Sequence, residues 1–127
     1  MSKFEAINTD AAPAAIGPYS QAIKLDNLLF LSGQIPLDPL TMELVPGGLA
    51  EQANQVFKNL RAVISASGAT SEAAVKLTIY MTDLSGFPIV NEVMATFFSK
   101  PYPARATIEV SGLPKGALVE VDAIVAL

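Results

Sequence analysis

The sequence predicts a single α+β domain, residues 1–127, in which two helices cover one face of a β-sheet. Three observations predict this class. Two stretches repeat apolar residues at helical spacing, and several shorter stretches alternate apolar and polar residues with a period of two. No internal repeat, low-complexity tract or linker divides the 127 residues. A chain of this length buries one hydrophobic core, so one domain is the simplest organisation.

The first predicted elements are a loop and a hairpin. The segment 11–19 contains two prolines and a glycine, which interrupt regular structure, and it is expected to be a loop able to close over a ligand. Gln21–Leu25 and Leu28–Ser32 are short apolar runs separated by Asp26-Asn27, so they predict a β-hairpin. Residues 37–48 carry further Pro and Gly residues and are predicted to be irregular.

The two helices are predicted at Leu49–Ser67 and from about Ser85 to Ser99. Gly68 is a suitable C-terminal stop for the first, and Pro88 lies in the first turn of the second, where proline is tolerated. The apolar stripe of the first helix consists of Leu49, Ala53, Val56, Phe57, Leu60, Val63 and Ile64.

The remaining strands are Ala74–Met81, Arg105–Val110 and Leu118–Val125. Their alternation assigns one apolar face, which is expected to receive both helices. That face should contain Val75, Leu77, Ile79, Met81, Ala106, Ile108, Val110, Val119, Val121, Ala123 and Val125. Arg105, Thr107 and Glu109 are therefore expected on the opposite face with Glu120 and Asp122. Leu118 and Ile124 also lie on that second face, which is expected to be covered by other subunits.

Composition excludes several kinds of chemistry. The chain has no Cys and no His, so thiol nucleophiles, imidazole bases and the usual zinc sites are absent. Its net charge of −4, without a basic run, argues against nucleic-acid binding. The first residues form no apolar signal-peptide core, and no stretch has the length of a bilayer span. A cytoplasmic protein without a membrane partner is expected.

Arg105 is the first candidate site residue, because the chain has only two arginines and the other, Arg61, falls on the polar stripe of the first helix. One interpretation is structural, an ion pair of Arg105 with Glu109 or Asp122. The other is capture of a small carboxylate, which the planar guanidinium can bind through two parallel hydrogen bonds.

Glu120 is the second candidate, either paired with Lys76 or Lys115 or acting as a base that orients water. Asn91 interrupts an apolar helical stripe, so it either caps a backbone carbonyl or marks the edge of a pocket. Tyr19 follows the Pro/Gly loop, and it either packs in the fold or closes a site. Ser32 and Gly33 end a strand where a ligand can approach backbone amides.

These segments, taken together, resemble the RidA/YjgF family, the reactive intermediate deaminases. The resemblance covers nearly the whole chain, and the order and spacing of the motifs are more specific than any one of them. It is carried by the segments 16–22 (IGPYSQA), 32–39 (SGQIPLDP), 87–93 (FPIVNEV), 103–110 (PARATIEV), 113–116 (LPKG) and 119–121 (VEV).

The resemblance implies a chorismate-mutase-like α+β fold with a mixed sheet and two helices on one face. It implies a homotrimer whose sheets form a barrel and whose three sites lie between subunits. The implied reaction is hydrolysis of reactive 2-imino acids and their enamine tautomers, such as 2-aminoacrylate/2-iminopropanoate and 2-iminobutanoate, to 2-keto acids and ammonia. No cofactor or metal is implied.

The resemblance also implies a role for each candidate residue. Arg105 would hold the substrate carboxylate, Glu120 would orient water or carry a proton, and Tyr19 would close the pocket and help place the water. The substrate-binding positions would be Arg105, Ser32, Gly33, Asn91 and Thr107. Thr107 departs from the family pattern, in which cysteine is usual, and this puts substrate preference in question.

Two other classes of function remain open. A non-catalytic trimer that senses 2-keto acids or related carboxylates would use the same arginine, although it gains nothing from Glu120 beside a bound anion. An RNA-acting protein, an activity ascribed to some relatives, is disfavoured by the acidic charge.

Overall fold

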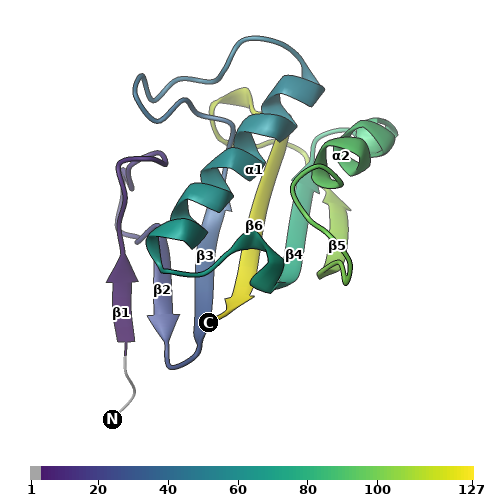
Figure 1. The fold of residues 1–127 in the computed structure, drawn as a ribbon. Coiled ribbons are helices and arrows are strands. Elements are labelled where there is room, and N and C mark those ends of the chain that lie inside the picture. Colours follow the sequence, from purple (N-terminus) through teal and green to yellow (C-terminus); the bar gives the residue numbers. More distant parts are fainter. Residues whose placement is uncertain (1–3) are drawn as a thin grey trace.

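The computed structural model describes residues 4–127, which form one six-stranded mixed sheet in the order β1-β2-β3-β6-β4-β5 (Figure 1). The strands are β1 (Phe4–Ile7), β2 (Ala22–Leu25), β3 (Leu28–Gln34), β4 (Ala74–Met81), β5 (Ala104–Glu109) and β6 (Val119–Ala126). Only β4 and β5 pair in parallel, and every other neighbouring pair is antiparallel. The helices are α1 (Leu49–Ala66) and α2 (Phe87–Met94), with short 3-10 turns at Ser71–Ala73, Leu84–Gly86 and Pro114–Gly116.

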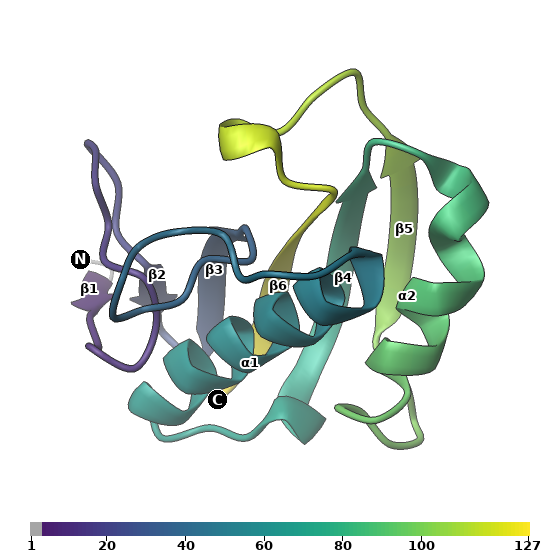
Figure 2. The same ribbon diagram turned by 90° about the horizontal axis from the view of Figure 1, so that it is seen from above.

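Both helices cover the same face of the sheet, as the sequence predicts (Figure 2). Helix α1 packs on β3 and β6, and α2 lies beside α1 on the side of β5 (Figure 1). Helix α1 begins where the Glu51 carboxylate accepts the Gly48 N–H at 2.8 Å, and it ends before Gly68, whose φ of +91° continues no helix. The two-residue turn at Asp26-Asn27 is also confirmed, because Leu25 pairs directly with Leu28.

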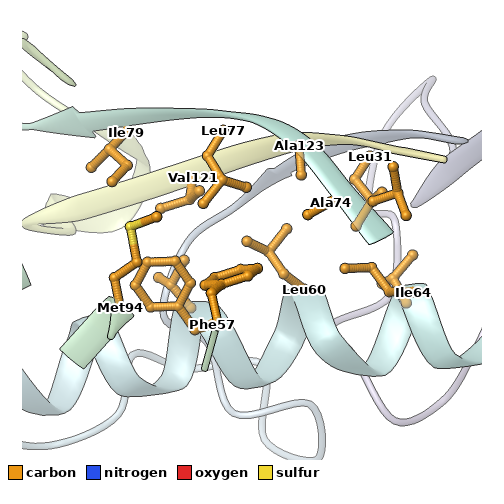
Figure 3. Close-up of a cluster of buried hydrophobic side chains, with 14 of the residues drawn as sticks. Leu31, Phe57, Leu60, Ile64, Ala74, Leu77, Ile79, Met94, Val121 and Ala123 are labelled. Carbon is orange, nitrogen blue, oxygen red and sulfur yellow. The ribbon is translucent and has the colours of Figure 1, made fainter. Parts of the chain in front are cut away.

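The hydrophobic core lies between α1 and the sheet (Figure 3). Phe57 of α1 occupies its centre, and its ring contacts Phe97 at 5.5 Å and Phe98 at 5.8 Å between centroids. Both contacting rings come after the end of α2. The predicted helix from Ser85 to Ser99 is therefore too long, because α2 stops at Met94. Consecutive helical residues point about 100° apart, so the chain must leave the helix to bring both rings to Phe57.

The predicted faces of β5 are wrong. Arg105, Thr107 and Glu109 pair with Leu77, Ile79 and Met81 of β4, and those three β4 side chains are fully buried beneath the helices. Opposed residues in a sheet share a face, so the polar positions of β5 point to the helix side and Ile108 points away from it. A polar pattern is tolerated there because β5 is an edge strand covered only by α2, which itself presents Asn91.

Two further differences concern β4 and β1. A register shift between Ala74 and Lys76 leaves Val75 45% exposed and buries Ala74 in its place, contrary to the predicted alternation. The edge strand β1 does not figure among the predicted elements. Three of its four residues are exposed, so it carries no hydrophobic alternation that a sequence pattern could show.

Candidate functional site

Arg105 lies on edge strand β5 and faces α2. Its Nη1 donates to Asn91 Oδ1 and lies 3.7 Å from Met94 Sδ, and its guanidinium carbon lies 4.8 Å from the centre of the Phe87 ring. The ring face carries partial negative charge and attracts the cation, so three α2 side chains orient the guanidinium. A cavity of about 490 Å³ opens beside it, lined by Asn91, Met94, Ala95, Tyr102, Pro103 and Arg105.

Neither carboxylate considered as a structural partner contacts Arg105. Glu109 accepts the backbone N–H of Leu84 at 3.0 Å, and Asp122 accepts the Tyr80 hydroxyl at 2.9 Å on the opposite face of the sheet. Asn91 lies at the pocket edge and bonds the arginine side chain. Arg105 is exposed and lines the cavity, so its planar donor fork is accessible to a small carboxylate.

Glu120 lies on β6 in a second cavity of about 330 Å³, formed between loops at the end of the sheet. Gly33 belongs to a register shift in β3 between Leu31 and Gln34, and a Cβ at Gly33 would overlap the Glu120 carboxylate. Only glycine therefore lets the carboxylate lie against the strand backbone. Burial, and then the negative charge of Asp122, raise the pKa of Glu120, so this group exchanges its proton nearer to neutral pH than a free carboxyl.

The loop that carries Tyr19 borders the Glu120 cavity and is held by two polar side chains. Buried Gln21 donates to the carbonyls of Pro13 at 2.8 Å and Thr9 at 3.0 Å, and its own oxygen accepts the Thr9 N–H at 2.7 Å. The Ser32 hydroxyl donates to the Ser20 carbonyl at 2.6 Å. The Ser32 side chain thus fixes the loop beside Tyr19, whose half-exposed ring lines the cavity.

Helix α1 anchors the other loops of this cavity through two buried amides. Asn59 donates to the carbonyls of Ile35 at 3.3 Å and Leu37 at 3.0 Å, and Gln52 accepts the backbone N–H of Leu118 at 2.8 Å. These bonds tie the backbone of both loops directly to α1. The helix therefore sets the positions of the chain segments on both sides of Glu120.

Thr107 lies two residues from Arg105 on the helix side of β5. Within residues 4–127, its Oγ1 is buried and has no hydrogen-bond partner. A buried hydroxyl without a partner is costly, so it is a free donor or acceptor beside Arg105.

Within a single chain the structure does not bring all the predicted site residues together. Arg105 pairs across β4 with Leu77, which pairs with Ala123 of β6 on the helix side of the sheet. Glu120 lies three residues before Ala123 and therefore points to the other side. The two charged side chains thus point to opposite faces of the sheet. Strand spacing and residue rise separate their Cα atoms by about 14 Å, before the opposite directions of the side chains are added. The prediction that Arg105 and Glu120 share a sheet face is wrong, because each side chain of β5 points to the face opposite to the predicted one. Arg105, Asn91 and Thr107 form one half-site, and Glu120, Gly33, Ser32 and Tyr19 form another.

Sequence reasoning missed two residues of the second half-site. The sequence pattern predicts Gln21 only as a strand residue, and its loop-holding role has no signal beyond an amide in an apolar run. The pattern predicts Tyr80 on the polar face of β4, and pairing it with Glu120 requires knowing that β4 and β6 are neighbours. Across residues 4–127, no group of three or more acidic side chains is arranged to hold a metal ion. Neither helix in this part of the chain combines the length and apolar character needed to cross a membrane.

Fold and half-sites together define a class of protein: a small α+β chain with one mixed sheet, two helices on one face, an edge arginine and a glutamate beside a strand glycine. The model of the Endoribonuclease L-PSP family matches residues 9–127. The chain belongs to this family, which is also the YjgF/RidA family.

Individual relatives agree with the family match. The chain is 54% identical to Protein DfrA of Myxococcus xanthus, over 94% of this chain and 93% of the relative. It is 47% identical to the 2-iminobutanoate/2-iminopropanoate deaminase of Mus musculus, over 93% of this chain and 87% of the relative. Among solved structures, RidA from the Antarctic bacterium Psychrobacter sp. PAMC 21119 superposes with a TM-score of 0.94 at 47% identity, covering 97% of this chain and 99% of the other.

Proposed function

We propose that this protein hydrolyses 2-imino acids to 2-keto acids and ammonia, in sites formed between the subunits of a homotrimer. The relatives named as 2-iminobutanoate/2-iminopropanoate deaminases support the substrate class. The observation that carries the proposal is the division of the site. Each half lies in its own cavity on a different face of the protomer, so one half meets its complement only on a second copy of the chain.

In this proposal the Arg105 half binds the substrate. The guanidinium holds the carboxylate through two parallel hydrogen bonds, and Asn91 keeps the fork in place. The unpartnered hydroxyl of Thr107 supplies a further hydrogen bond to the bound anion. Binding the carboxylate leaves the imine carbon as the electrophile that faces the neighbouring subunit.

The Glu120 half then supplies the proton transfers. Water attacks the carbon of the protonated imine while Glu120 accepts a proton from the water, which gives a neutral carbinolamine. Glu120 returns that proton to nitrogen, the C–N bond breaks as the carbinol hydroxyl loses its proton to the departing ammonia, and ammonium and the 2-keto acid leave. A carboxyl with a raised pKa suits both directions of this exchange. The Gly33 backbone borders the water position, and Tyr19 closes the cavity above it.

The small acidic site also favours this function over action on RNA. The chain carries a net charge of −4, and the second cavity contains one carboxylate and one lysine, Lys115. Phosphate backbones require several cations in a row, which neither half-site offers.

The test is a coupled assay in which serine dehydratase generates 2-aminoacrylate and pyruvate release is followed with and without this protein. Hydrolysis faster than the spontaneous reaction is expected. Arg105→Lys keeps the charge but loses the fork, so kcat/KM should fall by roughly 10- to 100-fold, as expected for lost hydrogen bonds to a charged group. Pyruvate binding measured by calorimetry, without any hydrolysis by the wild type, would instead identify a 2-keto acid sensor.

A further inference from the structure

Tyr80 and Asp122 form a hydrogen-bonded pair next to Glu120 on the face of the sheet away from the helices. Tyr80 is directly opposite Glu120 in the β4–β6 register, and Asp122 follows Glu120 by two residues on the same face. The Tyr80 hydroxyl reaches diagonally across the ladder and donates to Asp122 Oδ2 at 2.9 Å. The tyrosine therefore lies beside one carboxylate while it bonds the other.

The charged and titratable groups around Glu120 lie on the sheet and on the loops that line the cavity. On the sheet they are Tyr80 and Asp122, and from the loops that line the cavity they are Tyr19 and Lys115. Lys115 directs its ammonium to the Met42 carbonyl at 3.4 Å, so it is held by another loop. Asp122, about 7 Å further along the strand, is the negative charge that Glu120 meets on its own face.

The titration directions agree with this geometry. The hydrogen bond to Asp122, followed by burial and the charges of Asp122 and Glu120, raises the pKa of Tyr80, so its hydroxyl keeps its proton and remains a donor. The same hydrogen bond fixes the position of the Asp122 carboxylate relative to Glu120. Burial first and Asp122 second raise the pKa of Glu120.

On the basis of the proposed function, we propose that Tyr80 and Asp122 are positioning residues for Glu120. The Tyr80 hydroxyl holds the Asp122 carboxylate in place on the same sheet face as Glu120, and the negative charge held there strengthens Glu120 as a proton acceptor. One proton then moves from the attacking water to Glu120 and from Glu120 to the leaving nitrogen. Without the pair, Glu120 would take up the proton from water less readily.

The experiment measures the titration of Glu120 in the resting protein, by NMR of 13C-labelled glutamate side chains, with Glu120→Gln used to assign the signal. Asp122→Asn removes the neighbouring charge and should lower the titration midpoint of Glu120 by roughly half a pH unit or more. Tyr80→Phe should shift it in the same direction by a smaller amount, because the Asp122 carboxylate is then no longer held in place on the Glu120 face. The acidic limb of the kcat/KM profile should move with the NMR midpoint in both variants.

Asp26→Asn is the matched control, because it removes the same charge at the β2–β3 turn, at the far end of the sheet, where φ is +52° and asparagine is tolerated. It should leave the Glu120 midpoint unchanged. In the Asp122→Asn background, Tyr80→Phe should have no further effect, since the charge that Tyr80 positions is already gone.

Two results would overturn the inference: an unchanged Glu120 midpoint in Asp122→Asn, or a Tyr80→Phe shift of equal size with and without Asp122. A third result would separate the two proposals. If the Glu120 midpoints shift as expected but the wild type hydrolyses no imine, the role of Tyr80 and Asp122 is supported and the proposed function is contradicted.

Discussion

At the residue scale, the Glu120 carboxylate occupies the space where a side chain at Gly33 would begin. A methyl group at Gly33 would overlap Glu120 Oε2 and lie 3.0 Å from Glu120 Cδ. Gly33→Ala should therefore displace the carboxylate while the core stays intact. We expect hydrolysis to fall by roughly 100-fold, the loss typical of a misplaced proton-transfer group, with little change in the circular dichroism spectrum.

Gly112→Ala is the matched control for this substitution, because a Cβ at Gly112 meets no atom within 4 Å. It adds the same methyl group outside both cavities and should keep full activity. Equal activity of the two variants would show that the position of Glu120 against the β3 backbone is unimportant for turnover.

Glu120→Gln should separate the chemical role of this carboxyl from its effect on stability. Hydrolysis should fall by roughly two orders of magnitude, because the proton carrier is lost. The pKa of Glu120 is raised in the folded state, so the folded protein binds this proton more tightly than the unfolded chain. The resulting stability is present below the unfolded pKa and is lost as pH rises through the folded pKa.

Glutamine has no proton to lose, so Glu120→Gln should become more stable relative to the wild type as pH rises. The check is the difference in Tm between variant and wild type at pH 4 and at pH 8. A difference that stays constant over this range would contradict the raised pKa.

Sequence reasoning selected most of the residues that make up the two half-sites but assigned Arg105 and Thr107 to the wrong face. Arg105, Glu120, Gly33 and Asn91 stand out because charged, amide or glycine positions interrupt apolar patterns. The orientation of Arg105 could not be read from β5 itself, where Ile108 and Thr107 are about equally compatible with either face of a half-covered edge strand. Only the tertiary contact of β5 with α2 decides which of these two adjacent side chains faces the helices.

At the element scale, helix α1 connects the core to the loops of the Glu120 cavity through Asn59. This side chain is 1% exposed and donates to two loop carbonyls. Asn59→Leu preserves size but leaves both carbonyls without this donor, so the free energy of unfolding should fall by about 1–3 kcal/mol. Denaturant unfolding measures the effect.

Lys58→Ala changes the adjacent, exposed residue of α1 and should alter stability by less than about 0.5 kcal/mol. If Asn59→Leu behaved like Lys58→Ala, the loop anchors would contribute nothing to folding.

The predictability of each element follows its burial. Helix α1 and the strands β3, β4 and β6 are flanked by core on one side, so their apolar spacing is regular enough to locate them. Helix α2 was predicted too long because Phe98 continues the helical stripe, although it reaches Phe57 from outside the helix. The register shifts at Val75 and Gly33 arise from the pairing of two strands, so the sequence pattern of one strand alone cannot predict them.

At the scale of the whole molecule, the uncovered face of the sheet carries large apolar side chains. Phe30 is 39% exposed and lies opposite Ile124, and Ile108 is 45% exposed. In the proposed homotrimer these side chains are covered by other subunits. Light scattering should give about three times the chain mass of 13.3 kDa. Phe30→Glu places an unpaired charge in that contact, so it should dissociate the trimer.

Leu40→Glu is the control for Phe30→Glu, because Leu40 is 91% exposed on the loop between β3 and α1. It introduces the same charge and should leave the mass unchanged. A wild-type protein that is monomeric at micromolar concentration would exclude the trimer, and with it the completion of the site by a second copy.

The opposite directions of Arg105 and Glu120 have a genetic consequence: the two positions should complement each other between chains. If one subunit contributes the arginine and its neighbour the glutamate, Arg105→Ala and Glu120→Gln are each inactive alone, yet every mixed trimer contains one site with both residues intact. Unfolding the two variants together and refolding them in equal amounts should restore about a quarter of wild-type activity, the fraction expected from random assembly of a cyclic trimer. Two broken enzymes would then make a working one without any change of sequence.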